Sequence, residues 1–149
     1  MSIRLSGPPR GARGPTLDPA ALRDRAQRVL RAVGQPRGEL SIALVDDLAM
    51  QDLNRRYRGI DRPTDVLSFS LVEGPGAEHR GRLLGDVVID VETAAGQARR
   101  RHRSLDDEIE RLLVHGVLHL LGHDHEQPDE ARAMRAEERR VRRALREAG

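Results

Sequence analysis

The chain has 149 residues, and its 26 basic residues, all of them arginine, face 24 acidic ones to give a formal net charge of +2. This length fits one domain that can fold without cross-links, and the absence of cysteine excludes disulfides and thiolate metal sites. One Tyr, one Phe and no Trp argue against a protein that stacks several nucleic-acid bases on aromatic rings. No segment has the length and apolarity of a signal peptide or a membrane span, so we expect a cytoplasmic protein.

Proline and glycine are frequent in residues 1–16, which predicts a flexible N-terminal arm with a short strand at Ile3–Leu5. An amphipathic segment over 17–34 predicts a helix, because Asp18 can cap its first turn and Gly34 can end it. The later elements are expected as a strand over 39–46, a short helix over 47–57, a loop from 58 running into a strand that ends near 72, a turn or hairpin loop over 73–81, a strand over 82–91, and helices near 92–101, 105–121 and 128–148.

Strands and helices are interleaved along the chain, and the two strands on either side of 73–81 are expected to be linked as a hairpin. This order predicts an α+β fold with one mixed β-sheet packed with helices. The sequence contains no internal repeat and no second boundary, so residues 17–149 are expected to form a single domain.

Arginine is concentrated in two segments, "RRRHR" at 99–103 and "RRVRRALR" at 139–146. Clusters of this kind suit the phosphate backbone of a nucleic acid. A solvated helix face explains either segment equally well when that segment is taken alone.

Four of the six histidines lie in the stretch "HGVLHLLGHDH" at 115–125. His115 and His119 are one turn apart on the predicted helix, so both imidazoles project to the same side and can bind one metal ion. His123 would lie about 12 Å further along a straight helix than His115, too far to reach the same ion. Gly122 can end the helix and allow the chain to turn back.

After such a turn, His123 and His125 are both candidates for a third ligand. Three histidines would leave a fourth position for water, as in catalytic zinc sites. The alternatives are a histidine pair without metal, and a structural zinc site, which would usually be richer in cysteine.

The histidine stretch resembles the signature H-G-x-L-H-L-x-G-x-D-H of the YbeY family, which are bacterial metal-dependent endoribonucleases of ribosomal RNA maturation. Two upstream segments resemble the family's other blocks in the same order, "LNRRYRGIDRPTDVLSF" at 53–69 and "LLGDVVID" at 83–90. The resemblance therefore spans residues 53 to 125, whereas the arm and the C-terminal helix carry no motif.

The resemblance implies a zincin-like metal site on a helix, in which His115, His119 and His125 bind one zinc ion (Zn2+) per chain and His123 occupies a variable position. It also implies that Arg58 is a functional residue of the active-site cleft, and we expect Arg58 and His115 to be the catalytic residues. The implied partners are single-stranded ribosomal RNA, the small ribosomal subunit and its assembly factors, with no membrane and no DNA.

The histidine spacing is also similar to that of the metzincin proteases, H-E-x-x-H-x-x-G-x-x-H, where a glutamate follows the first histidine. Gly116 stands at that position and can neither deprotonate water nor protonate a leaving amine. RNA cleavage depends less on such a base, because zinc lowers the pKa of bound water and a guanidinium can hold phosphate oxygens. Asp124 and Asp65 are possible carboxylates that contact the metal ligands, or proton acceptors, and the alternative for each is to cap a turn. Whether water or an RNA 2′-OH is the nucleophile stays open.

The function predicted from these features is a zinc-dependent, single-strand-specific endoribonuclease in 16S rRNA 3′-end maturation and ribosome quality control. The main alternative is a ribosome-assembly factor with a mainly structural metal site, since no general base is recognisable. A metallopeptidase is the third hypothesis, and it lacks the glutamate that such an enzyme uses.

Overall fold

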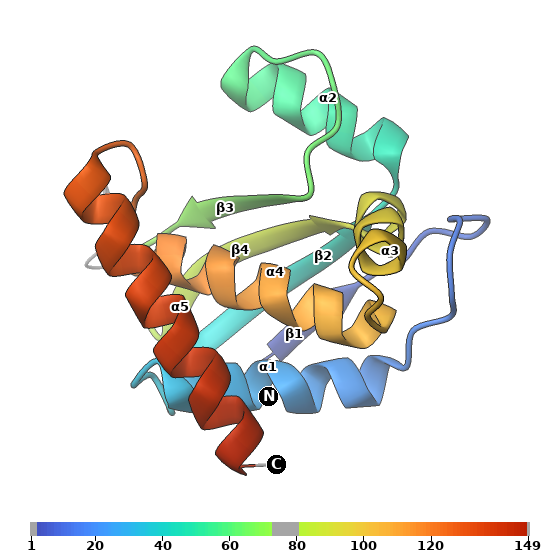
Figure 1. Cartoon of the computed structure of the whole chain (residues 1–149). Helices are drawn as coiled ribbons and strands as arrows, with labels where there is room; N and C mark the ends of the chain where they lie inside the picture. Colours follow the sequence, from blue (N-terminus) through green and yellow to red (C-terminus); the bar gives the residue numbers. More distant parts are fainter. Residues whose placement is uncertain (1–2, 73–80, 149) are drawn as a thin grey trace.

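A computed structural model of the chain describes residues 3–72 and 81–148 (Figure 1). Within them, the elements are β1 (Ile3–Ser6), α1 (Pro19–Ala32), β2 (Glu39–Val45), α2 (Asp47–Arg58), β3 (Val66–Ser70), β4 (Leu83–Asp90), α3 (Val91–Arg100), α4 (Leu105–Leu120) and α5 (Pro128–Ala148).

The strands form one sheet in the order β1-β2-β4-β3. The pairs β1–β2 and β2–β4 are parallel, whereas β3 and β4 are antiparallel. The predicted mixed sheet and α+β fold are therefore confirmed, and the antiparallel pair is the one expected of a hairpin. The expected hairpin loop itself lies outside the described residues, apart from Gly81.

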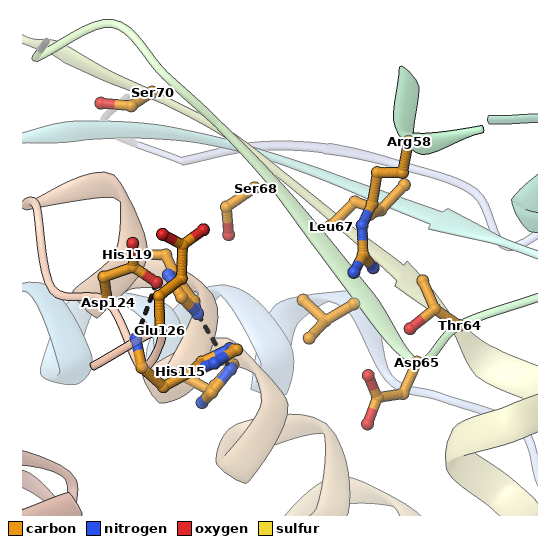
Figure 2. A pocket seen from close by; sticks show the side chains of 12 residues that line it. Arg58, Thr64, Asp65, Leu67, Ser68, Ser70, His115, His119, Asp124 and Glu126 are labelled. Carbon is orange, nitrogen blue, oxygen red and sulfur yellow. Dashed lines mark hydrogen bonds between the residues drawn. The ribbon is translucent and has the colours of Figure 1, made fainter. Parts of the chain in front are cut away.

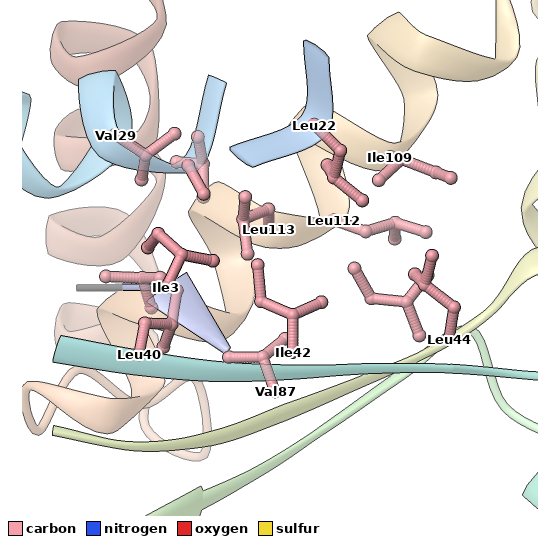
Figure 3. Packing of buried hydrophobic residues seen from close by; sticks show 14 of the residues in the cluster. Ile3, Leu22, Val29, Leu40, Ile42, Leu44, Val87, Ile109, Leu112 and Leu113 are labelled. Carbon is pink, nitrogen blue, oxygen red and sulfur yellow. The ribbon is translucent and has the colours of Figure 1, made fainter. Parts of the chain in front are cut away.

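The main core lies between one face of the sheet and the helices α1, α3, α4 and α5 (Figures 1 and 3). Alternate residues of β2 point into it, namely Leu40, Ile42 and Leu44, because successive side chains of a strand face opposite sides. Val45 faces the other side, where α2 contributes Met50 to a smaller core. The sheet thus has a helical layer on one face and α2 on the other.

Helix α4 lies in the middle of the helical layer and is buried on nearly all sides. Its N-terminus is capped by Ser104, whose hydroxyl accepts the N–H of Asp107 at 3.1 Å. A helix that is apolar around most of its circumference is held by packing on several neighbours. The two helical histidines therefore project from a rigid element.

The predicted boundary at Arg58 is wrong. Arg58 was expected at the start of a loop, but it is the last residue of α2. Gly59 follows in the left-handed conformation, with φ 70°, and its N–H bonds the carbonyl of Arg55 at 3.0 Å. A glycine at this position ends a helix one residue after the last helical one, so the helix extends up to the glycine.

The predicted strand at Ile3–Leu5 is present as β1, one residue longer, and Ile3 is buried in the main core. Asp18 caps α1 as predicted, by accepting the N–H of Ala20 at 3.0 Å. No helix in the described ranges is long and apolar enough to cross a membrane.

Candidate metal centre and cleft

His115 and His119 stand one turn apart on α4 with their rings nearly perpendicular, at an interplanar angle of 76°. Their Nε2 atoms are 3.1 Å apart, and their ring centroids are separated by 4.7 Å. Both side chains are partly buried at the edge of the cleft. The predicted helical pair is therefore formed with its ring nitrogens converging on one point.

The chain turns back after α4 through Gly122, whose φ is 99°. The N–H of Gly122 bonds the carbonyl of His119 at 3.0 Å, and the N–H of His123 bonds that of Leu118 at 3.0 Å. These two bonds form a Schellman motif, which needs a left-handed residue at the position of Gly122. The predicted end of the helix at this glycine is thus present.

The turn brings His125 to the helical pair. Its ring centroid lies 5.1 Å from that of His119 and 5.9 Å from that of His115, and one ligand atom from each of the three residues lies within 4.8 Å of the others. His123 is outside this group. Of the two candidates for a third ligand, the structure therefore joins His125 to the pair.

His115 has a second contact that sequence reasoning missed. Its Nδ1 lies 2.8 Å from Oε1 of Glu138 on α5. The pKa of Glu138 is lowered, chiefly by this hydrogen bond. A sequence pattern could not reveal the contact, because α5 carries no motif and its rotation relative to α4 is set by packing.

His119 is partly buried, and burial acts on its protonation. Its pKa is lowered first by burial and then by the neighbouring charges that His115 and His125 would carry when protonated. A neutral imidazole is the form that binds a metal ion. The lowered pKa of His119 therefore favours the form of this side chain that a metal site requires.

Gly116 lies directly against β3. A Cβ built there would be 2.8 Å from Cγ1 of Val87 and 3.1 Å from Oγ of Ser68. Ser68 also donates its hydroxyl to the carbonyl of Gly116 at 2.9 Å, and Ser70 donates to that of Leu120 at 2.8 Å. Side chains of β3 and β4 therefore occupy the space that a side chain at position 116 would need.

The histidines open into a cleft of about 530 Å³ whose opposite wall holds Arg58 (Figure 2). Figure 2 shows the Arg58 side chain extending from the end of α2 into this space, and Arg58 makes no ion pair within residues 3–72 and 81–148. The residues around the cleft are Arg58, Thr64, Asp65, Val66, Leu67, Ser68, Ser70, His115, His119, Asp124, His125 and Glu126. The structure thus brings the guanidinium of Arg58 and three imidazoles into one cavity.

Comparison with known proteins identifies the family. The family model described as endoribonuclease YbeY matches residues 14–146. The chain belongs to the endoribonuclease YbeY family. The predicted resemblance is therefore confirmed, and it covers nearly the whole chain rather than residues 53 to 125 alone.

Relatives of the same name are identical to this chain at about half of the aligned residues. Endoribonuclease YbeY of Anaeromyxobacter sp. (strain Fw109-5) is 48% identical over 145 residues, covering 97% of this chain and 72% of the relative. That of Aquifex aeolicus (strain VF5) is 48% identical over 105 residues, covering 70% and 68%. A solution structure from Thermotoga maritima, 23% identical, matches with a TM-score of 0.63 over 96% of this chain and 88% of that one, and supports the fold alone.

Both aspartates predicted near the site line the cleft, and each also has a local partner. Asp65 accepts a hydrogen bond from the side chain of Gln97 at 3.1 Å. Asp124 accepts the N–H of His125 at 2.7 Å, which fixes the turn that carries this histidine. Glu126, which sequence reasoning did not single out, adds an exposed carboxylate to the same wall. Any catalytic role of Asp65 or Asp124 stays a prediction.

The two basic segments lie close together in the structure. The pKa of Arg142 is lowered, first by burial and then by the guanidinium groups of Arg103, Arg111 and Arg146. Arg140 differs from these, because it pairs with Glu137 at 2.9 Å and donates to the carbonyl of Ala32 at 3.0 Å. Part of the second segment therefore forms a joint basic surface with Arg103, while Arg140 fastens α5 to α1.

A second group of acidic side chains lies outside the cleft. Asp47 and Glu92 both pair with Arg13, at 2.9 Å and 3.0 Å. Asp90 is buried beside them, and its pKa is raised to about 7 by burial and by the carboxyl of Asp47. The guanidinium of Arg13 balances the charges of Asp47 and Glu92. These ion pairs therefore hold the N-terminal segment against the domain.

Proposed function

We propose that this chain is a zinc-dependent endoribonuclease that cleaves single-stranded RNA, with His115, His119 and His125 binding one zinc ion. Membership of the endoribonuclease YbeY family supports RNA as the substrate. The observation that carries the proposal is that Arg58 and the three histidines line the same cleft.

The histidine cluster fits a zinc ion in its donor set and spacing. Two nitrogen ligands of one tetrahedral zinc ion lie about 3.4 Å apart, which follows from zinc–nitrogen bonds of about 2.1 Å. The Nε2 atoms of His115 and His119 are 3.1 Å apart. Three histidines without a cysteine form the kind of donor set that leaves a position for water.

A zinc ion bound there would lower the pKa of a bound water to about 7 and polarise a phosphoryl oxygen. The chain's own residues would supply the rest of the chemistry. The guanidinium of Arg58 can hold two non-bridging phosphate oxygens and stabilise the charge that develops on them. The carboxylates of Asp124, Asp65 and Glu126 are the candidates within the cleft for a proton acceptor.

The surroundings of Gly116 disfavour a peptidase. The space next to the first histidine is taken by Val87 of β4 and Ser68 of β3, so these side chains would have to move before a glutamate could stand there. Amide cleavage needs a base and a proton donor at this position, whereas phosphate cleavage depends more on charge stabilisation. The close approach of the sheet to Gly116 therefore favours the nuclease.

We further propose that the biological substrate is 16S rRNA at its 3′ end, within a role in ribosome maturation and quality control. The small ribosomal subunit and its assembly factors are the proposed partners, and the cytoplasm is the proposed location. The joint basic surface formed by Arg103, Arg142 and Arg146 supports contact with a nucleic-acid backbone.

The test uses the purified full chain with a single-stranded model RNA and a matched duplex, with and without chelator. We expect one zinc per chain, cleavage of the single strand, and loss of cleavage in chelator that added zinc restores. His119→Ala and His125→Ala should lose both zinc and cleavage, whereas His123→Ala should keep both.

Three outcomes would change the proposal. Cleavage that persists after complete removal of metal would contradict a metal-dependent mechanism. Zinc-loaded protein that cleaves a peptide library but no RNA would favour the peptidase. Zinc-loaded protein that cleaves neither would favour the assembly factor with a structural metal site.

A further inference from the structure

We infer that Glu138 is a positioning residue. It fixes the proton of the His115 imidazole on Nδ1 and thereby directs Nε2 of His115 toward the proposed metal site. The inference deepens the proposed function, because it rests on His115 being a ligand. The motif that identifies the metal centre ends at position 125, so Glu138 belongs to a part of the chain without any motif.

The hydrogen bond between His115 and Glu138 determines the tautomer of the His115 imidazole. Nδ1 of His115 lies 2.8 Å from Oε1 of Glu138. An ionised carboxylate can only accept, and a neutral imidazole carries one proton, so the proton resides on Nδ1. The lone pair on Nε2 then faces His119, whose Nε2 is 3.1 Å away.

The position of Glu138 on α5 is unusual for a charged residue. Met134, Val141 and Leu145 are buried against the main core, and they lie four residues before, three after and seven after Glu138. These spacings place all four on one face of the helix. Glu138 therefore interrupts the apolar stripe at the level of His115, and only 25% of its side chain is exposed.

The packing of α5 also holds the carboxylate in place. The buried residues on either side fix the rotation of α5 against α4, so the carboxylate does not depend on a mobile loop. The neighbouring Glu137 pairs instead with Arg140, on another side of the helix. Among the described residues, Glu138 is thus the carboxylate of α5 that contacts the histidine cluster.

A partner that orients a metal-binding imidazole raises its affinity for the ion, and removal of such partners typically weakens binding about 10- to 100-fold. We expect this loss in Glu138→Ala. Glu138→Gln should lose less, because its amide oxygen can still accept the proton of Nδ1. Glu137→Gln is the matched control at the preceding residue, and the zinc affinity of this variant should equal that of wild type.

The experiment has two independent measurements. The first is the zinc dissociation constant of each full-length variant, obtained by competition with a chelator of known affinity. The second is the tautomer of His115 in metal-free protein, read from the 15N shifts of its imidazole. Wild type should show the Nδ1–H form, and Glu138→Ala should populate the Nε2–H form.

A purely structural role would lower the melting temperature of Glu138→Ala without changing either measurement in folded protein, and that result would overturn the inference. If Glu138→Ala fails to fold, the zinc affinity of Glu138→Gln and the His115 tautomer of wild type test the inference instead. An Nε2–H form of His115 in wild type would overturn the inference. If wild type binds no zinc, the proposed function fails, while the tautomer still tests the contact between Glu138 and His115.

Discussion

Ser68 on β3 donates its hydroxyl to the carbonyl of Gly116 on α4 at 2.9 Å, so strand and helix are joined beside the first histidine. A Cβ at position 116 would lie 2.8 Å from Cγ1 of Val87, which is fully buried. The position that holds a glutamate in many zinc hydrolases is therefore closed by side chains of β3 and β4. The sequence shows the glycine, and the structure shows why a side chain does not fit.

Gly116→Ala should lower the free energy of unfolding by about 1–3 kcal/mol, since overpacking a close contact costs this much. The alanine would by itself favour the helix by about 1 kcal/mol. Gly96→Ala on α3 is the matched control, because the nearest atom to its new Cβ is the flexible end of Arg100 at 3.5 Å. That variant should be stabilised by up to about 1 kcal/mol. Denaturant unfolding measures both, and equal effects would contradict the close packing at Gly116.

Arg58→Ala should reduce single-turnover cleavage of single-stranded RNA about 10²–10³-fold, as expected when a preorganised donor to transition-state charge is removed. Arg58→Lys should recover only part of this loss, because an ammonium keeps the charge but lacks the planar fork. Zinc content and melting temperature should stay near wild type. Arg55→Ala on the same helix is the control, since Arg55 pairs with Asp52 outside the cleft. Wild-type cleavage by Arg58→Ala would show that Arg58 does not hold the phosphate.

Replacing Arg103, Arg142 and Arg146 together by Gln should make RNA affinity less sensitive to salt. Each phosphate contact with a single strand contributes about 0.7 to the slope of log affinity against log salt, so three contacts predict a slope flatter by about 2. Arg140→Gln should leave the slope unchanged, because Arg140 is committed to Glu137 and Ala32. An unchanged slope in the triple variant would mean that these arginines only solvate the surface.

Asp90 predicts a pH dependence of stability. Its folded pKa is about 7, above the ordinary value of 3.8, so folding takes up a proton between these values. The stabilisation it contributes is present below about pH 4 and is lost as the pH rises to about 7. Asp90→Asn keeps a side-chain cap for α3 and cannot ionise, so its stability should fall less over this range. Chemical denaturation of metal-free protein from pH 4 to 8 measures the difference, and parallel curves would contradict the raised pKa.

Local features of the chain were predictable from the sequence. The spacing of His115 and His119, the turn at Gly122 and the cap at Asp18 depend only on residues a few positions apart. Helix periodicity, capping chemistry and the conformational freedom of glycine act over such distances. The wrong boundary at Arg58 arose because α2 continues up to Gly59, which lies two residues after the expected end of the helix at Tyr57.

Only the tertiary structure decided which distant groups share the site. The contacts of His115 with Glu138, of Gly116 with Ser68 and Val87, and of the cleft with Arg58 join segments far apart in the chain. Each depends on the rotation and separation of packed elements, which are fixed by the whole core rather than by any local pattern. The sequence by itself therefore determined that the histidine stretch resembles a metal site. The packing of α5, β3 and α2 around α4 determined which other residues surround these histidines.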